Sequence, residues 1–323
     1  MPEKAPEKKP NAAVQAKRRV TKIGPMYDFK QQELYSCMAI MRPLPLACCF
    51  ILLGIICLAF GAIWIGSASV AKESKVYRYD NLCDLNTKCT FRFELEEDLE
   101  APVYLYYRLE NYYQAYRRYF TSRSSSQLMG NNPNDYDTLG ACAPRISEDD
   151  DMHDPSAVYL PCGLVGYSYF NDTFRLMDDK GRRVDQSSKD VALPTDDVLY
   201  DDPGPSTEGI RIVDSFENPL LKVWMRVAAL PNFLKLYAII DEDLPAGMYK
   251  MEVENHYPVR DYDATKHFKL STVTWIGGRN FFVGFALVSL GLILFLFAAF
   301  IILKSIFWPR KLGNIAYLDW DGQ

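Results

Sequence analysis

Two long apolar runs, one near each end of the chain, dominate its hydropathy pattern. Residues 44–71 contain no charged side chain, and residues 281–303 form a run of 23 whose most polar member is Ser289. A helix that rises about 1.5 Å per residue needs roughly 20 apolar residues to cross the hydrocarbon core of a bilayer. No water is present there to satisfy open backbone groups. The pattern therefore predicts transmembrane helices at 44–71 and 281–303.

The charges beside these runs predict the orientation of the chain. Residues 1–43 carry a net charge of +5, residues 304–323 a net charge of +1, and residues 72–280 between the spans a net charge of −11. Positively charged flanks remain in the cytosol. We therefore expect two cytosolic tails, 1–43 and 304–323, around an extracytoplasmic ectodomain at 72–280. The first span lies too far from the start to be a cleavable signal peptide, which indicates an uncleaved signal anchor.

The segment between the spans has mainly the pattern of β-strands. Apolar and polar residues alternate at Cys89–Leu95, Leu221–Val227 and Tyr249–Val253, and the Pro-, Gly- and Asp-rich segment Asp196–Gly209 indicates turns. In Glu110–Ser122, aromatic residues recur at spacings of three and four, which predicts a short amphipathic helix. We expect a mainly antiparallel β ectodomain with a short helix.

The N-terminal tail begins differently from the rest of the chain. Residues 1–20 are mostly Lys, Pro, Ala and Glu, with almost no large apolar side chain. Such a composition cannot bury enough apolar surface to offset the entropy of ordering. We expect the start of the tail to be disordered.

Cysteine usage fits a translocated domain. Of the eight Cys, four lie between the spans: Cys83, Cys89, Cys142 and Cys162. Four Cys allow three connectivities, and short loops favour Cys83–Cys89 with Cys142–Cys162, since the other pairings close loops of more than about 50 residues. The sequon at Asn171 lies in the same region and is a candidate glycosylation site.

Residues for catalysis are missing from the sequence. The chain has three His residues, His153, His256 and His267, and none is at metal-ligand spacing with another. No nucleophile elbow or Walker A loop is present, so we expect neither an active site nor a cofactor or structural metal. The acidic run Glu148–Asp154 predicts a solvated loop, with a weak cation site as the alternative. The excess of acidic residues between the spans argues against a nucleic-acid partner.

Small residues recur every seven positions in both apolar runs. In lipid, small side chains let helix backbones approach closely, and a period of seven keeps them on one side of a left-handed helix pair. We therefore predict a packing seam that includes Gly54, Gly61, Gly284 and Gly291. The full heptad series are Ala47, Gly54, Gly61 and Ala68 in the first run, and Gly277, Gly284, Gly291 and Ala298 in the second.

Several long segments together resemble the Cdc-fifty family of flippase accessory subunits. The resemblance runs from about residue 28 to the end of the chain. The segments that carry it are Phe29–Leu34, Val103–Arg123, Pro161–Phe174, Met225–Tyr237, Leu244–Val259, Leu270–Gly284 and Arg310–Gly313.

The resemblance implies a non-catalytic β-subunit that forms a heterodimer with the catalytic α-subunit of a type-IV P-type ATPase. Such complexes move phospholipids to the cytosolic leaflet, and the β-subunit aids folding and export from the endoplasmic reticulum. The resemblance also implies an antiparallel β-sandwich ectodomain, structural disulfides Cys83–Cys89 and Cys142–Cys162, and a glycan on Asn171. The expected locations are the endoplasmic reticulum, the Golgi and the plasma membrane.

Two other functions share the same topology. A ligand-gated channel subunit also has two spans, inward termini and a disulfide-rich ectodomain, but it needs polar residues lining a pore, and neither span has them. A membrane-anchored receptor is the second alternative.

Overall fold

The structure is a computed structural model, and it describes residues 42–130, 139–148, 155–204 and 207–309. Most of the N-terminal tail, the acidic run from Asp149 with His153, and the motif Arg310–Gly313 lie outside the described residues. The chain divides into two compact units. One unit has two described segments, residues 42–51 and 296–309. The other unit is Leu52–Phe295.

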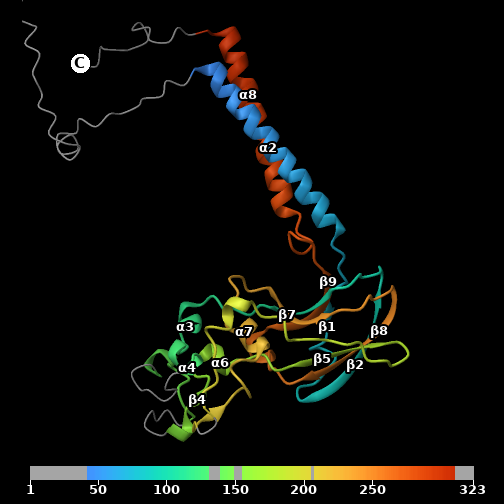
Figure 1. Ribbon diagram of the computed structural model, residues 1–323, viewed down its shortest axis with the longest axis vertical. Helices are drawn as coiled ribbons and strands as arrows, with labels where there is room; N and C mark the ends of the chain where they lie inside the picture. Colours follow the sequence, from blue (N-terminus) through green and yellow to red (C-terminus); the bar gives the residue numbers. More distant parts are fainter. Residues whose placement is uncertain (1–41, 131–138, 149–154, 205–206, 310–323) are drawn as a thin grey trace, which may run out of the picture. The chain divides into compact units, whose positions relative to one another are not determined.

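The two apolar runs form the two long helices, α2 (Pro43–Val70) and α8 (Phe282–Phe307). Figure 1 shows them side by side. Both are long and apolar enough to cross a membrane. Helix α8 continues beyond the predicted end because Lys304 lies in its last turn, where a cation interacts favourably with the helix dipole.

Two antiparallel sheets form the ectodomain, as the alternating pattern predicted. One sheet has four strands in the spatial order β1 (Tyr77–Arg78), β9 (Thr265–Thr272), β3 (Val103–Glu110) and β7 (Phe233–Ile240). The other has three strands in the order β2 (Thr87–Leu95), β8 (Gly247–Asn255) and β5 (Thr173–Asp178). The predicted strands Cys89–Leu95 and Tyr249–Val253 lie within β2 and β8.

The inner faces of the two sheets share one apolar core. Along β3, fully buried side chains alternate with half-buried ones, as expected for a strand with one face in a core. Phe93 of β2 and Phe268 of β9 meet across the sheets with ring centroids 5.4 Å apart and the rings edge to face. Phe174 of β5 also contacts Phe268, at 6.5 Å between centroids. These contacts make the ectodomain a β-sandwich.

The rest of the ectodomain is less regular. It contains short helices and one parallel strand pair. In the predicted turn segment Asp196–Gly209, Asp196 is the last residue of a short 3-10 helix, and the described residues from 197 to 209 contain neither helix nor strand. Its elements are α3 (Arg117–Phe120), α4 (Ser125–Leu128), η2 (Gly140–Cys142), η3 (Pro155–Ala157), β4 (Tyr159–Leu160), α6 (Leu164–Tyr167), η4 (Pro194–Asp196), β6 (Ile210–Arg211), α7 (Pro219–Met225) and η5 (Arg260–Tyr262).

The strand predicted at Leu221–Val227 is wrong, because most of this segment is the helix α7. The Asn218 side chain accepts a hydrogen bond from the Leu220 amide, and Pro219 occupies the first turn. Both are signals of a helix start. Leu221 and Trp224, three positions apart, are then buried on one face. The alternation of apolar and polar residues is compatible with a strand or a helix, and the cap at Asn218 with Pro219 favours the helix.

The helix predicted across Glu110–Ser122 is also wrong, apart from the single turn α3. Strand β3 continues to Glu110, and Asn111 then adopts a left-handed conformation with φ of 59°. The Tyr112 ring lies 6.0 Å from Trp224 and 6.2 Å from Tyr257, between centroids. The aromatic spacing therefore serves a ring cluster formed by distant parts of the chain, which a local helical period cannot predict.

Candidate functional site

The predicted glycine seam lies between the two spans of this chain. An added Cβ at Gly61 would lie 3.1 Å from the Gly284 carbonyl oxygen, and one at Gly54 would lie 3.3 Å from the Gly291 carbonyl oxygen. The remaining helical positions of both heptad series are buried as well: Ala47, Ala68 and Ala298. The first position of the second series, Gly277, is not part of the seam, because it precedes α8 in a turn closed by hydrogen bonds with Thr274.

A side chain larger than glycine at the seam would require its neighbours on the facing helix to shift. A Cβ at Gly61 would lie 2.8 Å from Val288 Cγ2, and a Cβ at Gly284 would lie 2.5 Å from Ile65 Cγ1. Gly66, in the same helix as Gly61, has open space where its Cβ would be. The glycines at the seam therefore permit a backbone contact that Gly66 does not make.

A hydrogen bond links α2 to the residues that precede α8. The Trp64 indole Nε1 donates to the Asn280 carbonyl oxygen at 3.1 Å. The Asn280 side chain in turn accepts a hydrogen bond from the Phe282 amide at 3.0 Å, which caps the first turn of α8. The start of the second span is thus fixed against the first.

Two disulfides connect segments of the ectodomain. Cys83 is bonded to Cys89, and Cys142 to Cys162, with Cα separations of 5.9 and 5.6 Å. The first closes the loop that leads into β2. The second holds the η2 turn against the segment before α6, where both sulfur-bearing residues are buried.

The sequon at Asn171 lies at the boundary between surface and core. Asn171 is exposed, while the next side chain, Asp172, is buried. The Thr173 hydroxyl donates to Glu254 Oε2 at 3.1 Å, and β5 begins at this residue. An exposed Asn beside an anchored strand is accessible to a glycan in the folded domain.

Asp172 is the acceptor at the centre of a buried polar network. Its Oδ1 accepts hydrogen bonds from the amides of His256 and Tyr257, both at 2.6 Å. Its Oδ2 accepts from the Tyr79 hydroxyl and from the Lys266 ammonium, both at 2.7 Å. Two amides, a hydroxyl and an ammonium thus share the two carboxylate oxygens, which is what allows the charge to be buried.

Lys266 is the cation of this network. Its ammonium group also donates to the side chain of Asn255 and to the Tyr257 carbonyl. Burial lowers the pKa of Lys266, and the opposing attraction of Asp172 limits that shift. The pair joins β9 to the start of β5, and so connects the two sheets.

Lys235 is a second buried cation, and it caps a helix. Its ammonium donates to the carbonyl oxygens of Val223, Trp224 and Arg226 at 3.0, 2.6 and 2.8 Å, at the C-terminal end of α7. The same group lies 4.8 Å from the centroid of the Trp224 ring. Burial lowers the pKa of Lys235 to about 7. Helix carbonyls left open at a C-terminus are satisfied in this way.

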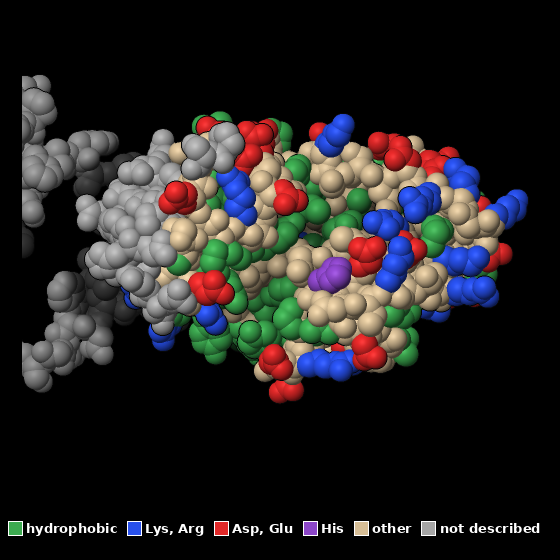
Figure 2. All heavy atoms as spheres, turned by 90° about the horizontal axis from the view of Figure 1, so that it is seen from below, with side chains coloured by type: hydrophobic (Ala, Val, Ile, Leu, Met, Phe, Trp, Pro, Cys, Tyr) green, Lys and Arg blue, Asp and Glu red, His purple; other side chains and the backbone are tan. Residues whose placement is uncertain are grey.

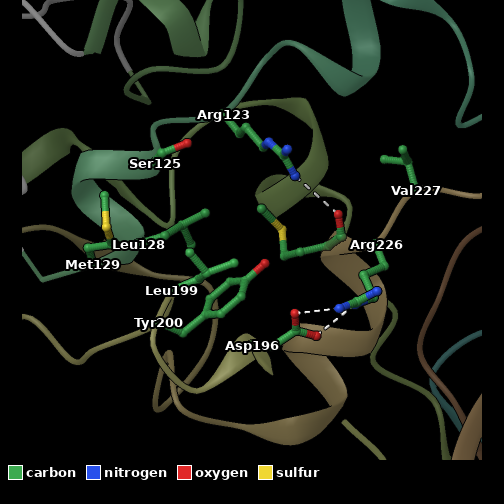
Figure 3. Close-up of a pocket in the computed structure, with 10 residues that line it drawn as sticks. Arg123, Ser125, Leu128, Met129, Asp196, Leu199, Tyr200, Arg226 and Val227 are labelled. Carbon is green, nitrogen blue, oxygen red and sulfur yellow. Dashed lines mark hydrogen bonds and ion pairs between the residues drawn. The ribbon is translucent and has the colours of Figure 1, made fainter. Parts of the chain in front are cut away.

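A cavity of about 450 Å³ lies between α4, η4 and α7. Figure 3 shows Asp196 and Arg226 paired at its edge, and Arg226 binds both carboxylate oxygens of Asp196 at 2.7 Å. Arg123 Nη1 donates to the Met225 carbonyl at 3.3 Å. Burial raises the pKa of Tyr200, whose hydroxyl therefore stays protonated. Among the described residues that line it, no nucleophile is hydrogen-bonded to a base.

The outer surface of the sandwich is charged with both signs. Figure 2 shows acidic and basic side chains interspersed on one face, with basic ones gathered toward the end that carries β2, β5 and β8. Lys88 lies 2.8 Å from Glu252, and Arg175 lies 3.2 Å from the same carboxylate oxygen. Partly exposed pairs of this kind contribute little to stability.

Within the described residues, no group of three or more His, Cys, Asp or Glu side chains could hold a metal ion. His256 is exposed and His267 is buried in β9. His267 lies among Glu110, Asp80 and two Arg residues, and its burial lowers its pKa. The described residues therefore pack the two spans against each other and form the sandwich core.

The sequence analysis missed the buried cations. Lys235 lies in β7 and Lys266 in β9. Because a Lys in a strand is ordinarily solvated, the sequence of either strand gives no sign that its ammonium group is buried. For Asp172, the sequence shows only that it directly precedes the alternating apolar and polar residues of β5. Its partners come from residues more than 80 positions away, so only the tertiary structure identifies them.

A family model and several curated proteins match this chain over most of its length. The model of the LEM3 (ligand-effect modulator 3) family / CDC50 family matches residues 67–311. This range includes the whole sandwich, both disulfides and the helix α8.

Curated relatives extend the match to most of the chain. ALA-interacting subunit 3 of Arabidopsis thaliana is 33% identical, over 95% of this chain and 93% of that protein. Cell cycle control protein 50A of Bos taurus is 32% identical, over 83% of this chain and 85% of that protein. Phospholipid-transporting ATPase accessory subunit CDC50 of Chaetomium thermophilum is 33% identical, over 75% of this chain and 66% of that protein.

Proposed function

This chain belongs to the LEM3/CDC50 family, and from that membership we propose that it is the accessory β-subunit of a phospholipid-transporting type-IV P-type ATPase. The observation that carries the proposal is the family match over residues 67–311, which takes in the ectodomain and the second span together. In this role the chain is non-catalytic. ATP hydrolysis and the lipid pathway belong to the catalytic α-subunit with which it forms a heterodimer.

In the proposed role, the paired spans bind the α-subunit within the membrane, and the sandwich binds it outside the cytosol. The seam of Gly54, Gly61, Gly284 and Gly291 holds the two spans together, which leaves their outer faces for lipid and for the helices of the α-subunit. Large apolar side chains are exposed on those outer faces, such as Leu52 and Phe60 on α2 and Leu296 and Phe300 on α8. The disulfides and the glycan on Asn171 stabilise the ectodomain outside the cytosol.

We further propose that both tails, 1–43 and 304–323, are cytosolic and that residues 72–280 lie outside the cytosol. Two observations support this orientation: the positive charge beside the outer ends of the spans, and the two disulfides between the spans, since disulfides persist in an oxidising compartment. The complex assembles in the endoplasmic reticulum and leaves it for the Golgi and the plasma membrane, and the chain is required for the folding and export of its partner.

The test has two parts. The tagged full chain, purified in mild detergent, is expected to retain a P-type ATPase at near-equal stoichiometry. Deletion of the gene is expected to reduce uptake of a fluorescent short-chain phospholipid and to trap the ATPase in the endoplasmic reticulum. Normal uptake and normal export in the deletion strain would refute the proposal, and an agonist-gated current from the purified chain would favour the channel instead.

A further inference from the structure

Helix α2 carries three free cysteines in two different environments. Cys48 and Cys49 lie close to its N-terminal end and are exposed, whereas Cys57 lies near its middle and is buried, with 8% of its surface accessible. The three thiols have the same chemistry, and they differ in depth along the helix and in accessibility. Such a pair of juxtamembrane cysteines is typical of a site of covalent lipid attachment.

The length of α2 places the exposed pair at the edge of the bilayer. The helix has 28 residues, so it is about 42 Å long, whereas the hydrocarbon core is about 30 Å thick. If the excess is divided between the two ends, the core begins about 6 Å from Pro43. Cys48 and Cys49 are then within about 3 Å of that boundary, and Cys57 is near the middle of the bilayer.

Arg42 supports this placement of the boundary. It is exposed and directly precedes α2, which itself contains no charged residue. A charged side chain at the start of an apolar helix lies at the headgroup level. Cys48 is six positions further along the chain, within reach of an enzyme that works at the membrane surface.

The two thiols also point away from the packing seam. The buried positions of α2 include Ala47 and Gly54, which belong to the heptad series. Cys48 and Cys49 follow Ala47 and turn to the open side of the helix, where Leu52 and Leu53 are exposed as well. An acyl chain on either sulfur could therefore lie along an apolar surface without disturbing the contact between the spans.

We propose that Cys48 and Cys49 are sites of S-acylation by a long-chain fatty acid. The proposal rests on the orientation in the proposed function, since acyl-coenzyme A and its transferases act from the cytosolic side. The cysteine sulfur attacks the thioester carbonyl of acyl-coenzyme A, and a new carbon–sulfur bond forms. The bond from that carbonyl to the coenzyme A sulfur breaks, and coenzyme A leaves as the thiol with the proton of the cysteine. No group is oxidised or reduced.

The experiment counts acyl groups on the full chain produced together with its ATPase in eukaryotic cells. Cys37 is replaced by Ser throughout, so that only cysteines of α2 are counted. Free thiols are blocked with N-ethylmaleimide without a reductant, thioesters are cleaved with hydroxylamine, and the released thiols are labelled with a polymer maleimide that retards the protein on a gel. We expect one or two hydroxylamine-dependent retarded bands. The variant C48S/C49S should lose them, and the matched control C57S should keep them.

Two results on the acyl groups would overturn the proposal. One is the absence of hydroxylamine-dependent bands in the background chain, and the other is the persistence of these bands in C48S/C49S. The orientation is checked separately with an N-terminal epitope, which should stain only in permeabilised cells. If the epitope stains in intact cells, the proposed orientation is wrong and the acylation proposal falls with it. If the epitope is internal and no band appears, acylation alone is refuted.

Discussion

Lys266 Nζ lies 2.7 Å from Asp172 Oδ2 inside the sandwich, and neither side chain has more than 1% of its surface exposed. Asp172 is also the middle residue of the sequon that begins at Asn171. A single residue thus connects a candidate modification site on the surface to the ion pair in the core.

Asp172→Asn should destabilise the ectodomain by about 3–5 kcal/mol, because it leaves the buried charge of Lys266 without its counter-ion. The variant keeps an Asn-x-Thr sequon, so glycosylation at Asn171 still reports that the chain is translocated. Thermal unfolding of the purified chain measures the loss. The surface variant Lys88→Met should cost at most about 1 kcal/mol, and an equal loss in both variants would contradict this account of the pair.

Loss of the Cys142–Cys162 disulfide should cost more than loss of Cys83–Cys89. The two bonds join residues 20 and 6 positions apart. If restriction of the unfolded chain dominates, the longer loop contributes about 3 kcal/mol and the shorter about 2 kcal/mol. The double Ser variants of each pair are compared by thermal unfolding and by the fraction that leaves the endoplasmic reticulum. A larger loss from the shorter loop would show that native packing, and not chain entropy, sets the order.

Gly61→Leu and Gly284→Leu should separate the two spans, since each added side chain would collide with the facing helix. Gly66→Leu is the matched control, because nothing lies within 4 Å of its Cβ position. We expect the first two variants to lower the thermal stability of the full chain in detergent and the yield of co-purified ATPase. The ectodomain disulfides should still form. Wild-type stability and yield for both seam variants would refute the seam.

Lys235 should make stability depend on pH. Its pKa in the folded chain is about 7, against about 10.4 in an unfolded chain. Between these values the unfolded chain binds a proton that the folded chain does not, so stability rises with pH from about 7 to 10.4. Below pH 7 both states are charged and this contribution is flat.

The variant Lys235→Met isolates that contribution. Wild-type stability measured from pH 7 to 9 should rise by up to about 1.4 kcal/mol per pH unit relative to Lys235→Met. Lys189→Met, which changes an exposed lysine, should keep the wild-type slope. Identical slopes for the wild type and Lys235→Met would mean that the three carbonyl groups hold the ammonium charged over this range.

The sequence by itself determined the features that depend on local composition and period. Both spans follow from apolar length, the strands β2 and β8 from alternation, and the seam glycines from a seven-residue repeat. These are properties of a single segment in a given solvent, so no distant residue is needed to predict them. The helix-start signals of α7 at Asn218 and Pro219 are local as well, whereas the alternation at Leu221–Val227 is compatible with a strand or a helix.

Only the tertiary structure decided which segments meet. It made Glu110–Ser122 part of an aromatic cluster around Tyr112, it paired the seam glycines of the two spans, and it buried Asp172 with Lys266. Asp172 and Lys266 are 94 positions apart, and the glycine pairs Gly61–Gly284 and Gly54–Gly291 are 223 and 237 positions apart. The aromatic cluster likewise combines rings from several elements. The desolvation of a charge and the fit of two helix backbones are properties of the assembled pair, and neither partner encodes them alone.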